Sequence, residues 1–106
     1  SSGIPFVCDT GHDVCVIVED CASACALFSH TSALALMGTN LLETHVDAVK
    51  RYKRVLVALD KDATDKAISI VRKLSGILPT KLMVLSTDIK NMKKEELDEF
   101  IGSYIN

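Results

Sequence analysis

The chain alternates short hydrophobic runs with segments in which hydrophobic residues recur every three or four positions. Four runs are nearly continuous in hydrophobic residues and predict strands, because strands covered on both faces have this pattern. Residues 3–8 can add an edge strand. Strands that alternate with helices indicate an α/β fold with about four mainly parallel strands. The four strands are predicted at residues 14–19, 32–37, 54–60 and 81–86.

Four other segments have their hydrophobic residues on one helical face. We expect these helices to flank the sheet on both faces, as buried parallel strands require. His45 lies on the second helical face and is expected to be a partly buried core residue rather than a ligand. The predicted faces are Cys21, Cys25 and Phe28; Leu41, Leu42, His45, Val46 and Val49; Ala67, Ile70, Val71, Leu74 and Leu78; and Leu97, Phe100, Ile101, Tyr104 and Ile105.

A length of 106 residues fits a single domain with one hydrophobic core. With 48% hydrophobic and 25% charged residues, the composition is that of a soluble globular protein. No hydrophobic run approaches the ~20 residues that span a bilayer, and no leader is visible, so we expect a cytoplasmic protein without a membrane partner. The first residue is Ser1 rather than Met, so we expect either a domain cut from a longer polypeptide or a short artificial sequence at its start.

Charge is unevenly distributed along the chain. The formal net charge of −2 predicts no strong bulk attraction to nucleic acid. All 12 Lys and Arg residues lie between Lys50 and Lys94, while the first 46 residues carry only acids. Any basic contact with phosphate groups is therefore expected from the second half of the chain.

Four cysteines lie near the start of the chain. They could indicate disulfides or zinc, but their spacings contain no C-x-x-C pair. Cys15 falls in a predicted strand, and Cys21 and Cys25 are one helical turn apart, so we expect reduced, buried thiols. His12 with Cys8 and Cys15 gives only three candidate ligands, which is a weak signal for a metal site.

Acidic residues end or follow three of the four predicted strands. Ligands of open α/β sheets bind beyond the carboxyl ends of the strands, so these acids are expected to share one edge. Side chains alternate along an extended segment, which places Asp60 and Asp62 on the same side. The acids are Glu19 and Asp20 after the first strand, Asp60 and Asp62 after the third, and Asp88 after the fourth, with Gly38 in the turn after the second.

Crowded carboxylates raise one another's pKa unless a positive charge neutralises them. Hard oxygen ligands without a nearby histidine favour Mg²⁺ or Mn²⁺, so we predict a divalent metal site at these acids. A structural alternative is that Asp62 caps a helix starting near Ala63, with Asp65 favoured by the helix dipole. That alternative leaves Asp60 and Glu19 unexplained, and capping is compatible with metal binding.

Four stretches carry a family resemblance: VIVEDCASACAL, ALMGTN, VLVALDKDATDKA and STDIKNMKKEEL. In order and spacing they resemble the Toprim domain of primases, topoisomerases, nucleases and recombination-mediator proteins. The likeness covers about residues 14–101, so residues 1–106 are interpreted as a single Toprim domain, with 1–13 as a possible edge strand and loop. The resemblance implies a compact Rossmann-like fold whose acids hold Mg²⁺.

The resemblance implies roles residue by residue. Glu19 matches the family's glutamate and is either a metal ligand or a general acid/base, while Gly38 matches the turn glycine. Asp60 and Asp62 match the Asp-x-Asp pair, and Asp88 matches a further acid of primase-type members, so all three are implied metal ligands. Glu19, Asp60 and Asp62 are the implied catalytic residues.

Two residues depart from the family pattern, and three lysines lie near the matched residues in the sequence. Asp20 and Asp65 stand where the family often has glycine, and both add negative charge. Lys61, Lys66 and Lys90 lie beside the acids and can contact phosphate or nucleotide, although ordinary surface lysines would look the same.

The motifs are most similar to the small Toprim domains of phage-type replication proteins, for which the host cytoplasm is the expected location. This likeness implies nucleotidyl transfer by a DNA primase, which makes RNA primers from nucleotides on single-stranded DNA. A neighbouring zinc-binding module or helicase is the expected partner. A Toprim nuclease, a recombination or repair component and a non-catalytic metal-binding domain remain alternatives.

Two further protein classes share parts of the pattern. A hydrophobic strand followed by Asp-x-Asp-x-Thr also fits haloacid-dehalogenase phosphatases, with Asp60 as nucleophile and Asp62 as acid/base. A phosphoacceptor receiver domain would use Glu19 and Asp20 as its acidic pair, Asp60 as acceptor, and Thr87. The phosphatase needs several strands after Asp60, and the receiver needs a strand after Thr87, where a helix is predicted.

Overall fold

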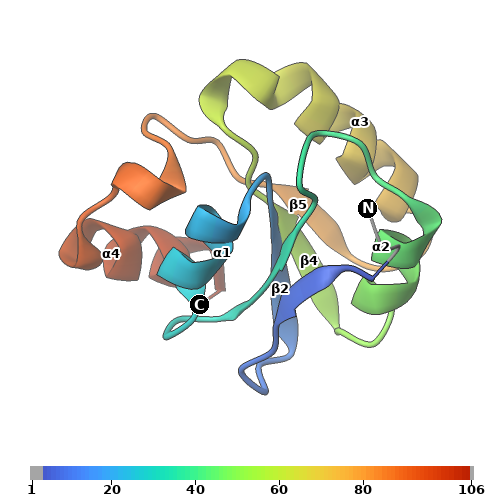
Figure 1. Ribbon diagram of the computed structural model, residues 1–106, viewed down its shortest axis with the longest axis horizontal. Helices are drawn as coiled ribbons and strands as arrows, with labels where there is room; N and C mark the ends of the chain where they lie inside the picture. Colours follow the sequence, from blue (N-terminus) through green and yellow to red (C-terminus); the bar gives the residue numbers. More distant parts are fainter. Residues whose placement is uncertain (1–3, 106) are drawn as a thin grey trace.

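A five-stranded sheet with the strand order β1-β3-β2-β4-β5 runs through the protein (Figure 1). The structure is a computed structural model that describes residues 4–105. Four strands pair in parallel, and β1 runs antiparallel to β3. The strands are β1 (Phe6–Cys8), β2 (Val14–Val18), β3 (Ser32–Ala35), β4 (Arg54–Val57) and β5 (Thr80–Leu82).

The predicted α/β fold is confirmed, with five strands rather than about four. The additional strand is the expected edge strand, of which Gly3 lies outside the described residues. β2 lies at the centre of the sheet, where Cys15 is aligned with Ser32 on one neighbour and Val55 on the other. Because both faces of β2 are covered, every residue from Cys15 to Val18 is fully buried.

β5 is shorter than the strand predicted at residues 81–86 and lies at an edge of the sheet. After a last bond from the Met83 N–H to the Val57 carbonyl, at 2.9 Å, the chain leaves the sheet. Lys81 is exposed and Val84 is 71% exposed, whereas Met83 is buried. The expectation that this strand is covered on both faces is therefore wrong.

Two helices cover each face of the sheet, as predicted (Figure 1). α1 and α4 pack on the face that carries Val16 and Leu56, and α2 and α3 pack on the face that carries Ile17 and Val57. No helix within residues 4–105 is long and apolar enough to cross a membrane. The helices are α1 (Cys21–Leu27), α2 (Glu43–Val49), α3 (Thr64–Leu74) and α4 (Lys94–Ile105), with the 3-10 helices η1 (Lys61–Ala63) and η2 (Ile89–Asn91) after β4 and β5.

The predicted buried face of α1 is wrong by a rotation of about one residue. Ser23, Ala24 and Leu27 are buried, whereas Cys25 is exposed and Phe28 is 56% exposed. Small side chains of similar hydrophobicity occupy most of this helix, so the hydrophobic period alone does not fix its rotation. The predicted faces of α3 and α4 lie against the sheet as expected.

The cysteines are less buried than the sequence suggests. All four are free thiols, but Cys8 and Cys21 are only partly buried and Cys25 is exposed. The expectation of buried thiols is correct for Cys15 alone among them. Burial raises the pKa of Cys15 to about 12, which keeps this thiol protonated at neutral pH.

His45 is a core histidine, as predicted, and is 4% exposed. Its Nδ1 accepts a hydrogen bond from the backbone N–H of Leu42 at 3.0 Å, at the start of α2. Burial lowers the pKa of His45, so the ring is neutral at neutral pH. Leu42 was expected on the same buried face, but it precedes the first turn of α2 and is 49% exposed.

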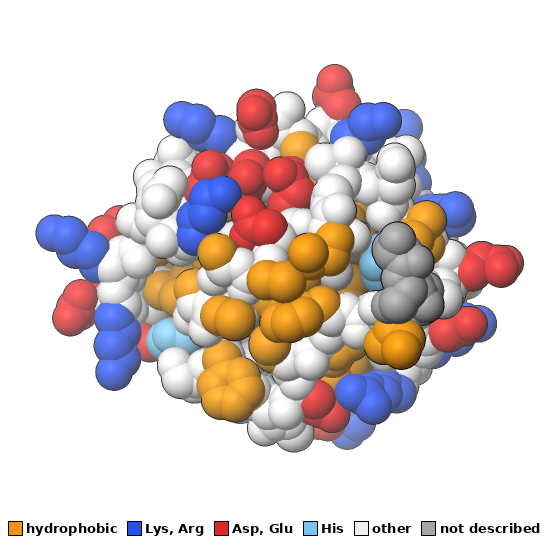
Figure 2. Space-filling model, viewed as in Figure 1, with side chains coloured by type: hydrophobic (Ala, Val, Ile, Leu, Met, Phe, Trp, Pro, Cys, Tyr) orange, Lys and Arg blue, Asp and Glu red, His pale blue; other side chains and the backbone are white. Residues whose placement is uncertain are grey.

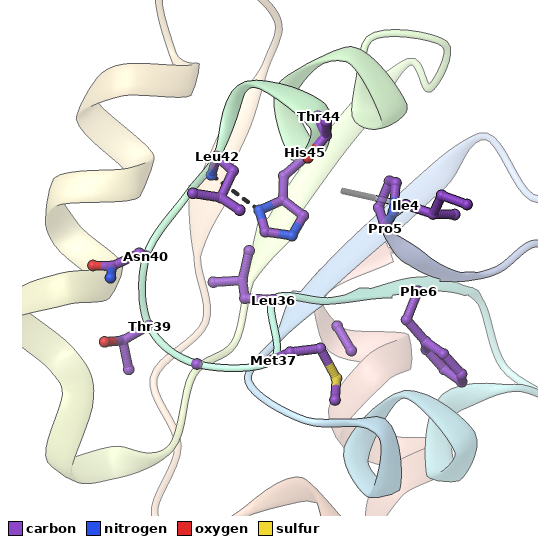
Figure 3. Close-up of a pocket in the computed structure, with 12 residues that line it drawn as sticks. Ile4, Pro5, Phe6, Leu36, Met37, Thr39, Asn40, Leu42, Thr44 and His45 are labelled. Carbon is purple, nitrogen blue, oxygen red and sulfur yellow. Dashed lines mark hydrogen bonds between the residues drawn. The ribbon is translucent and has the colours of Figure 1, made fainter. Parts of the chain in front are cut away.

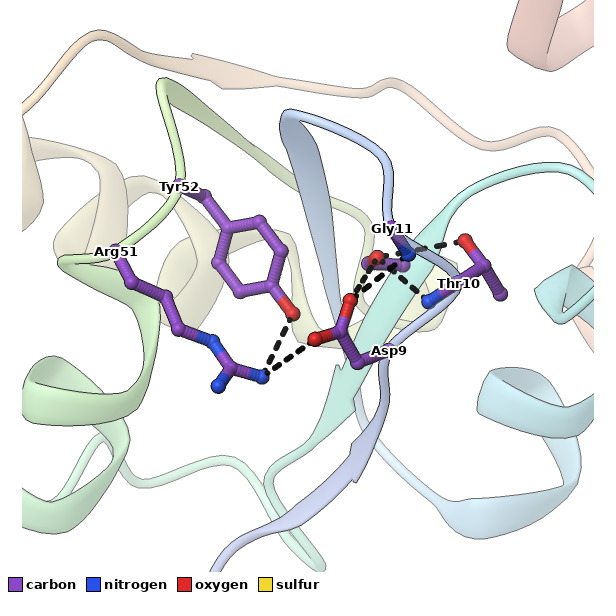
Figure 4. A network of polar contacts seen from close by, with 6 residues as sticks. Asp9, Thr10, Gly11, Arg51 and Tyr52 are labelled. Carbon is purple, nitrogen blue, oxygen red and sulfur yellow. Dashed lines mark hydrogen bonds and ion pairs between the residues drawn. The ribbon is translucent and has the colours of Figure 1, made fainter.

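A polar network fixes the amino-terminal edge of the parallel strands (Figure 4). Asp9 accepts hydrogen bonds from the Gly11 N–H at 3.0 Å and the Ser32 hydroxyl at 3.2 Å, and it pairs with Arg51 at 3.0 Å. These contacts, the Gly11 bond first, lower the pKa of Asp9. The network joins β1, β3 and the end of α2, and leaves the opposite edge of the sheet for the acids described next.

Candidate metal centre

The carboxyl edge of the sheet carries an acidic cluster, defined as Glu19, Asp20, Asp60, Asp62 and Asp88. Figure 2 shows acidic side chains gathered next to one another on one face of the molecule. Glu19 and Asp20 follow β2, and Asp60 follows the buried residues at the end of β4. Asp62 lies in η1, and Asp88 precedes η2. Parallel pairing of β2, β4 and β5 brings these segments to the same edge, as predicted.

Backbone hydrogen bonds tie the loops of this edge together. The Gly38 N–H donates to the Glu19 carbonyl at 3.1 Å, so the turn after β3 is fixed to the end of β2. The Lys61 N–H donates to the Asp88 Oδ1 at 3.3 Å, which joins the loops after β4 and β5. Gly38 has a φ of 149°, a conformation that side chains disfavour, which explains the need for glycine.

Glu19 lies at the middle of the acidic cluster and is partly buried. Burial is the first cause that raises its pKa, followed by Asp60 and, more weakly, Asp62 and Asp20. Its Oε1 is buried and has no hydrogen-bond partner among residues 4–105. A buried carboxylate oxygen without a partner costs free energy, which a bound cation or a proton would recover.

Asp60 shares this environment. Its pKa is raised first by burial and then by the negative charges of Asp88 and Asp20. Lys90 opposes this effect and draws the pKa of Asp60 downward, but the net direction remains upward. At neutral pH the cluster therefore combines crowded negative charge with incomplete solvation, which is the condition that a divalent cation relieves.

Asp20 and Lys90 form the neutralised border of the cluster. One Asp20 oxygen accepts from the Ser23 N–H at 2.9 Å and caps α1, and the other receives the Lys90 Nζ at 3.0 Å. The Ser23 bond, with help from Lys90, lowers the pKa of Asp20. The extra acid at position 20 is thus used as a helix cap, and the Lys90 ammonium contacts a carboxylate rather than lying free beside the cluster.

The alternative role for Asp62 is wrong, because α3 begins at Thr64 with Ala63 as its N-cap and has no side-chain cap. The turn of η1 shifts the helix start, and the Thr64 hydroxyl donates to the Lys61 carbonyl at 2.9 Å. Asp62 is exposed beside Glu19 and is left available as a ligand. Asp65 does lie in the first turn of α3, as expected.

The remaining lysines lie on the α3 side of the edge. Lys61 and Lys66 are exposed, and Lys66 lines a hollow of about 170 Å³ together with Lys73, Thr39 and Asn40. Lys73 was missed from the sequence, although its spacing of two helical turns from Lys66 placed both on one side of the predicted helix.

The donor set fits a hard divalent cation. Within residues 4–105, no three His, Cys, Asp or Glu side chains are already grouped to hold a metal ion. Mg²⁺ does not require such a cage, because it commonly uses one or two carboxylates and completes its shell with water and phosphate oxygens. Glu19, through its unpartnered Oε1, and the adjacent Asp60 supply carboxylates of this kind.

Comparison with known proteins identifies the family. The profile of the Toprim-like family matches residues 17–101, a span that runs from β2 into α4 and contains the whole acidic cluster. Searches of curated proteins and of solved structures return no match. Toprim domains generally bind divalent metal ions such as Mg²⁺ and belong to proteins that process nucleic acids. The fold, the acidic edge and this match agree, and the chain belongs to the Toprim-like family.

Proposed function

We propose that this domain is the catalytic part of a DNA primase and supports Mg²⁺-dependent or Mn²⁺-dependent nucleotidyl transfer in RNA primer synthesis. The observation that carries the proposal is the buried, unpartnered Oε1 of Glu19 beside Asp60, a pair whose pKa values are both raised. A site for nucleotidyl transfer needs carboxylates whose negative charge is not fully neutralised before the metal ion and the phosphate bind.

Glu19 and Asp60 would hold the metal ion, with Asp62 and Asp88 on the outer side of the same cluster. The ion would neutralise negative charge on the transferring phosphoryl group. In the alternative arrangement Asp60, Asp62 and Asp88 would hold the ion, and the raised pKa of Glu19 would suit this residue to accept a proton from an attacking hydroxyl. Lys90 holds Asp20 in place at the border and limits the repulsion felt by Asp60.

The lysines of the α3 side are proposed to contact the nucleic acid backbone. Lys61, Lys66 and Lys73 are exposed, and the latter two line one hollow. Phosphate contacts of this type position a strand without reading its sequence, which suits a primase that moves along single-stranded template. A neighbouring zinc-binding module or helicase would complete template binding, and the host or cell cytoplasm is the proposed location.

Two competing enzyme classes are disfavoured. The match of residues 17–101 to the Toprim-like family argues against a haloacid-dehalogenase phosphatase. A receiver domain would need another strand after Thr87, where the chain forms η2 and α4. A Toprim nuclease shares the acidic cluster, so the reaction product must separate it from a primase.

The test is an assay of primer synthesis and of strand cleavage by the protein that contains this domain, with Mg²⁺ or Mn²⁺ and single-stranded DNA. We expect RNA primers from the wild type and at least a 100-fold loss in Asp60→Asn. Asp47→Asn is the matched control, because Asp47 is an exposed acid on α2. Metal-dependent DNA cleavage without primer synthesis would replace the primase by a nuclease.

The isolated domain gives a second readout. Titration with Mg²⁺ should shift the amide resonances of Glu19, Asp60, Asp62 and Asp88, and Mn²⁺ should broaden the same signals. The absence of any response at these four residues would contradict the proposed metal site.

A further inference from the structure

A pocket of about 220 Å³ lies beside the acidic cluster on the same edge of the sheet (Figure 3). It is formed by the start of β1, the end of β3 and α2, because antiparallel β1 begins at the edge where β3 ends. Pockets for whole drug-sized ligands hold roughly 300–1,000 Å³, so this one suits a single ring system. The proposed function assigns no ligand to this pocket.

One side of the pocket is hydrophobic and partly open to solvent. Phe6 is 38% exposed, Leu42 is 49% exposed and Met37 is 64% exposed, and all three line the pocket. Figure 3 shows Leu42 beside His45, and Phe6 and Met37 on the far side of Leu36. Exposed hydrophobic side chains that line a concave site favour the binding of a ligand.

The other side carries hydrogen-bonding groups. Thr44 and His45 line it, which gives a hydroxyl and an imidazole, whereas the amide of Asn40 points away from the His45 ring (Figure 3). Because the His45 Nδ1 accepts from the Leu42 N–H, the neutral ring has its hydrogen on Nε2, at the opposite edge of the ring. Such a set can donate to and accept from the edge of a heterocycle, which a purely aliphatic ligand would not use.

The backbone beside the pocket is held in an unusual conformation. Met37 has a φ of 61°, which is uncommon for a residue other than glycine and costs about 1 kcal/mol. The Cys21 thiol donates to the Met37 sulfur at 3.2 Å, which ties the Met37 side chain to the first residue of α1. A thioether held in this way offers a polarisable surface to an aromatic ring.

The pocket is joined to the candidate metal centre by a backbone hydrogen bond. Gly38 lines the pocket, and its N–H donates to the carbonyl of Glu19. The two sites therefore lie on neighbouring strands, which are about 4.8 Å apart. Figure 2 shows hydrophobic side chains bordering the acidic ones on this face. In a nucleotide, the sugar separates the base from the phosphates by a similar distance.

We propose that this pocket binds the base of a nucleotide whose phosphates lie at the acidic cluster. Leu42 and Met37 contribute hydrophobic contacts to the base, and the Nε2–H of His45 bonds to its edge. The inference rests on the proposed function for the position of the phosphates, but binding of the base itself requires no metal.

The test is a titration of the labelled domain with adenosine, guanosine, cytidine and uridine without metal, followed by NMR. We expect at least one nucleoside to shift the Met37 methyl, the Leu42 methyl and the His45 ring signals, and ribose 5-phosphate to leave them unchanged. Leu42→Gln and Met37→Gln should each weaken this binding at least fivefold. Ile77→Gln is the matched control, because Ile77 is 48% exposed and lies outside the pocket.

A second arm separates a free nucleotide from a base of the template strand. With Mg²⁺, a nucleoside triphosphate should bind at least tenfold more tightly than its nucleoside and shift the same pocket signals. Pocket shifts with a single-stranded oligonucleotide alone, and none with triphosphate, would overturn the inference. Pocket shifts that depend on protein concentration without nucleoside would also overturn it and indicate a contact between two copies.

Failure of the two proposals can be distinguished. If Mg²⁺ shifts Glu19 and Asp60 while no nucleoside shifts the pocket, the inference is wrong and the proposed function stands. If nucleosides shift the pocket while Mg²⁺ leaves the acids unchanged, the base site stands and the proposed function is wrong.

Discussion

Lys90 reaches Asp20 across the acidic cluster, with 3.0 Å between Nζ and Oδ2, although the two residues are 70 positions apart in the chain. The contact raises the pKa of Lys90, first through its hydrogen bond to Asp20. The ammonium also opposes the rise in the pKa of Asp60. Lys90 thus supplies part of the positive charge that the cluster needs before a metal ion binds.

Replacing Lys90 by Met should therefore destabilise the metal-free protein. The pair is partly exposed and is screened by solvent, so the expected loss of stability is small. Added Mg²⁺ should stabilise Lys90→Met more than the wild type, because the variant has lost its internal counter-charge. Thermal unfolding with and without Mg²⁺ measures both effects. Lys81→Met, on the exposed edge strand, is the control, and an equal Mg²⁺ effect in the wild type and Lys90→Met would contradict this role.

Neutralising the cluster should stabilise the metal-free protein. The folded pKa values of Glu19 and Asp60 are raised above their ordinary values, so folding disfavours their ionised forms. This cost is absent below the ordinary carboxyl pKa and grows as the pH rises from that value to the folded pKa. Above the folded pKa the cost is complete. Asp60→Asn and Glu19→Gln should therefore each be more stable than the wild type at pH 7, because neither variant has this cost at the substituted position.

Thermal unfolding at pH 7 and at pH 4 tests this expectation. A gain of 1 kcal/mol raises the unfolding temperature of a domain of this size by about 4–8 °C, and the gain should shrink at pH 4. Asp65→Asn, in the first turn of α3, is the control and should not stabilise, since its charge favours the helix. Destabilisation of both cluster variants at pH 7 would show that their charges support the fold.

Metal should reverse the order of stability. At 100 times its dissociation constant, an ion that binds only the folded state adds about 2.7 kcal/mol. We expect Mg²⁺ to stabilise the wild type and to have little effect on Asp60→Asn or Glu19→Gln, so that the wild type becomes the more stable protein. A chelator should restore the original order. An unchanged Mg²⁺ effect in both variants would exclude the cluster as the binding site.

The sheet and the acidic edge could be predicted because both follow from short-range patterns. Continuous hydrophobic runs identified β2 and β4, and the residues after them identified Glu19 and Asp60. The rotation of α1 could not be predicted, since its small residues have nearly uniform hydrophobicity. The cap at Asp62 was misplaced because η1 delays the helix by one turn.

Long-range contacts and unusual backbone angles could not be predicted from the sequence. The contact of Lys90 with Asp20 joins segments that only the folded sheet brings together. No feature of the sequence predicts the positive φ of Met37, because methionine rarely adopts this conformation. Burial of the Glu19 Oε1 arises only in the folded protein, and no residue pattern encodes it. Those features define the border of the metal site and the neighbouring pocket.

Gly38→Ala should weaken both stability and metal binding. A Cβ at this position would have open space, but a φ of 149° is strained for any side chain. Relaxing the turn would move the N–H that donates to Glu19, so we expect a loss of about 1–3 kcal/mol in the free energy of unfolding and a lower Mg²⁺ affinity.

Gly76→Ala is the matched control, because the nearest atom to its Cβ would be 3.9 Å away and its φ is not positive. That variant should be neutral or gain about 0.4–1 kcal/mol. Chemical unfolding and Mg²⁺ titration of both variants measure the difference, and equal affinity in both would show that the Gly38 turn does not position Glu19.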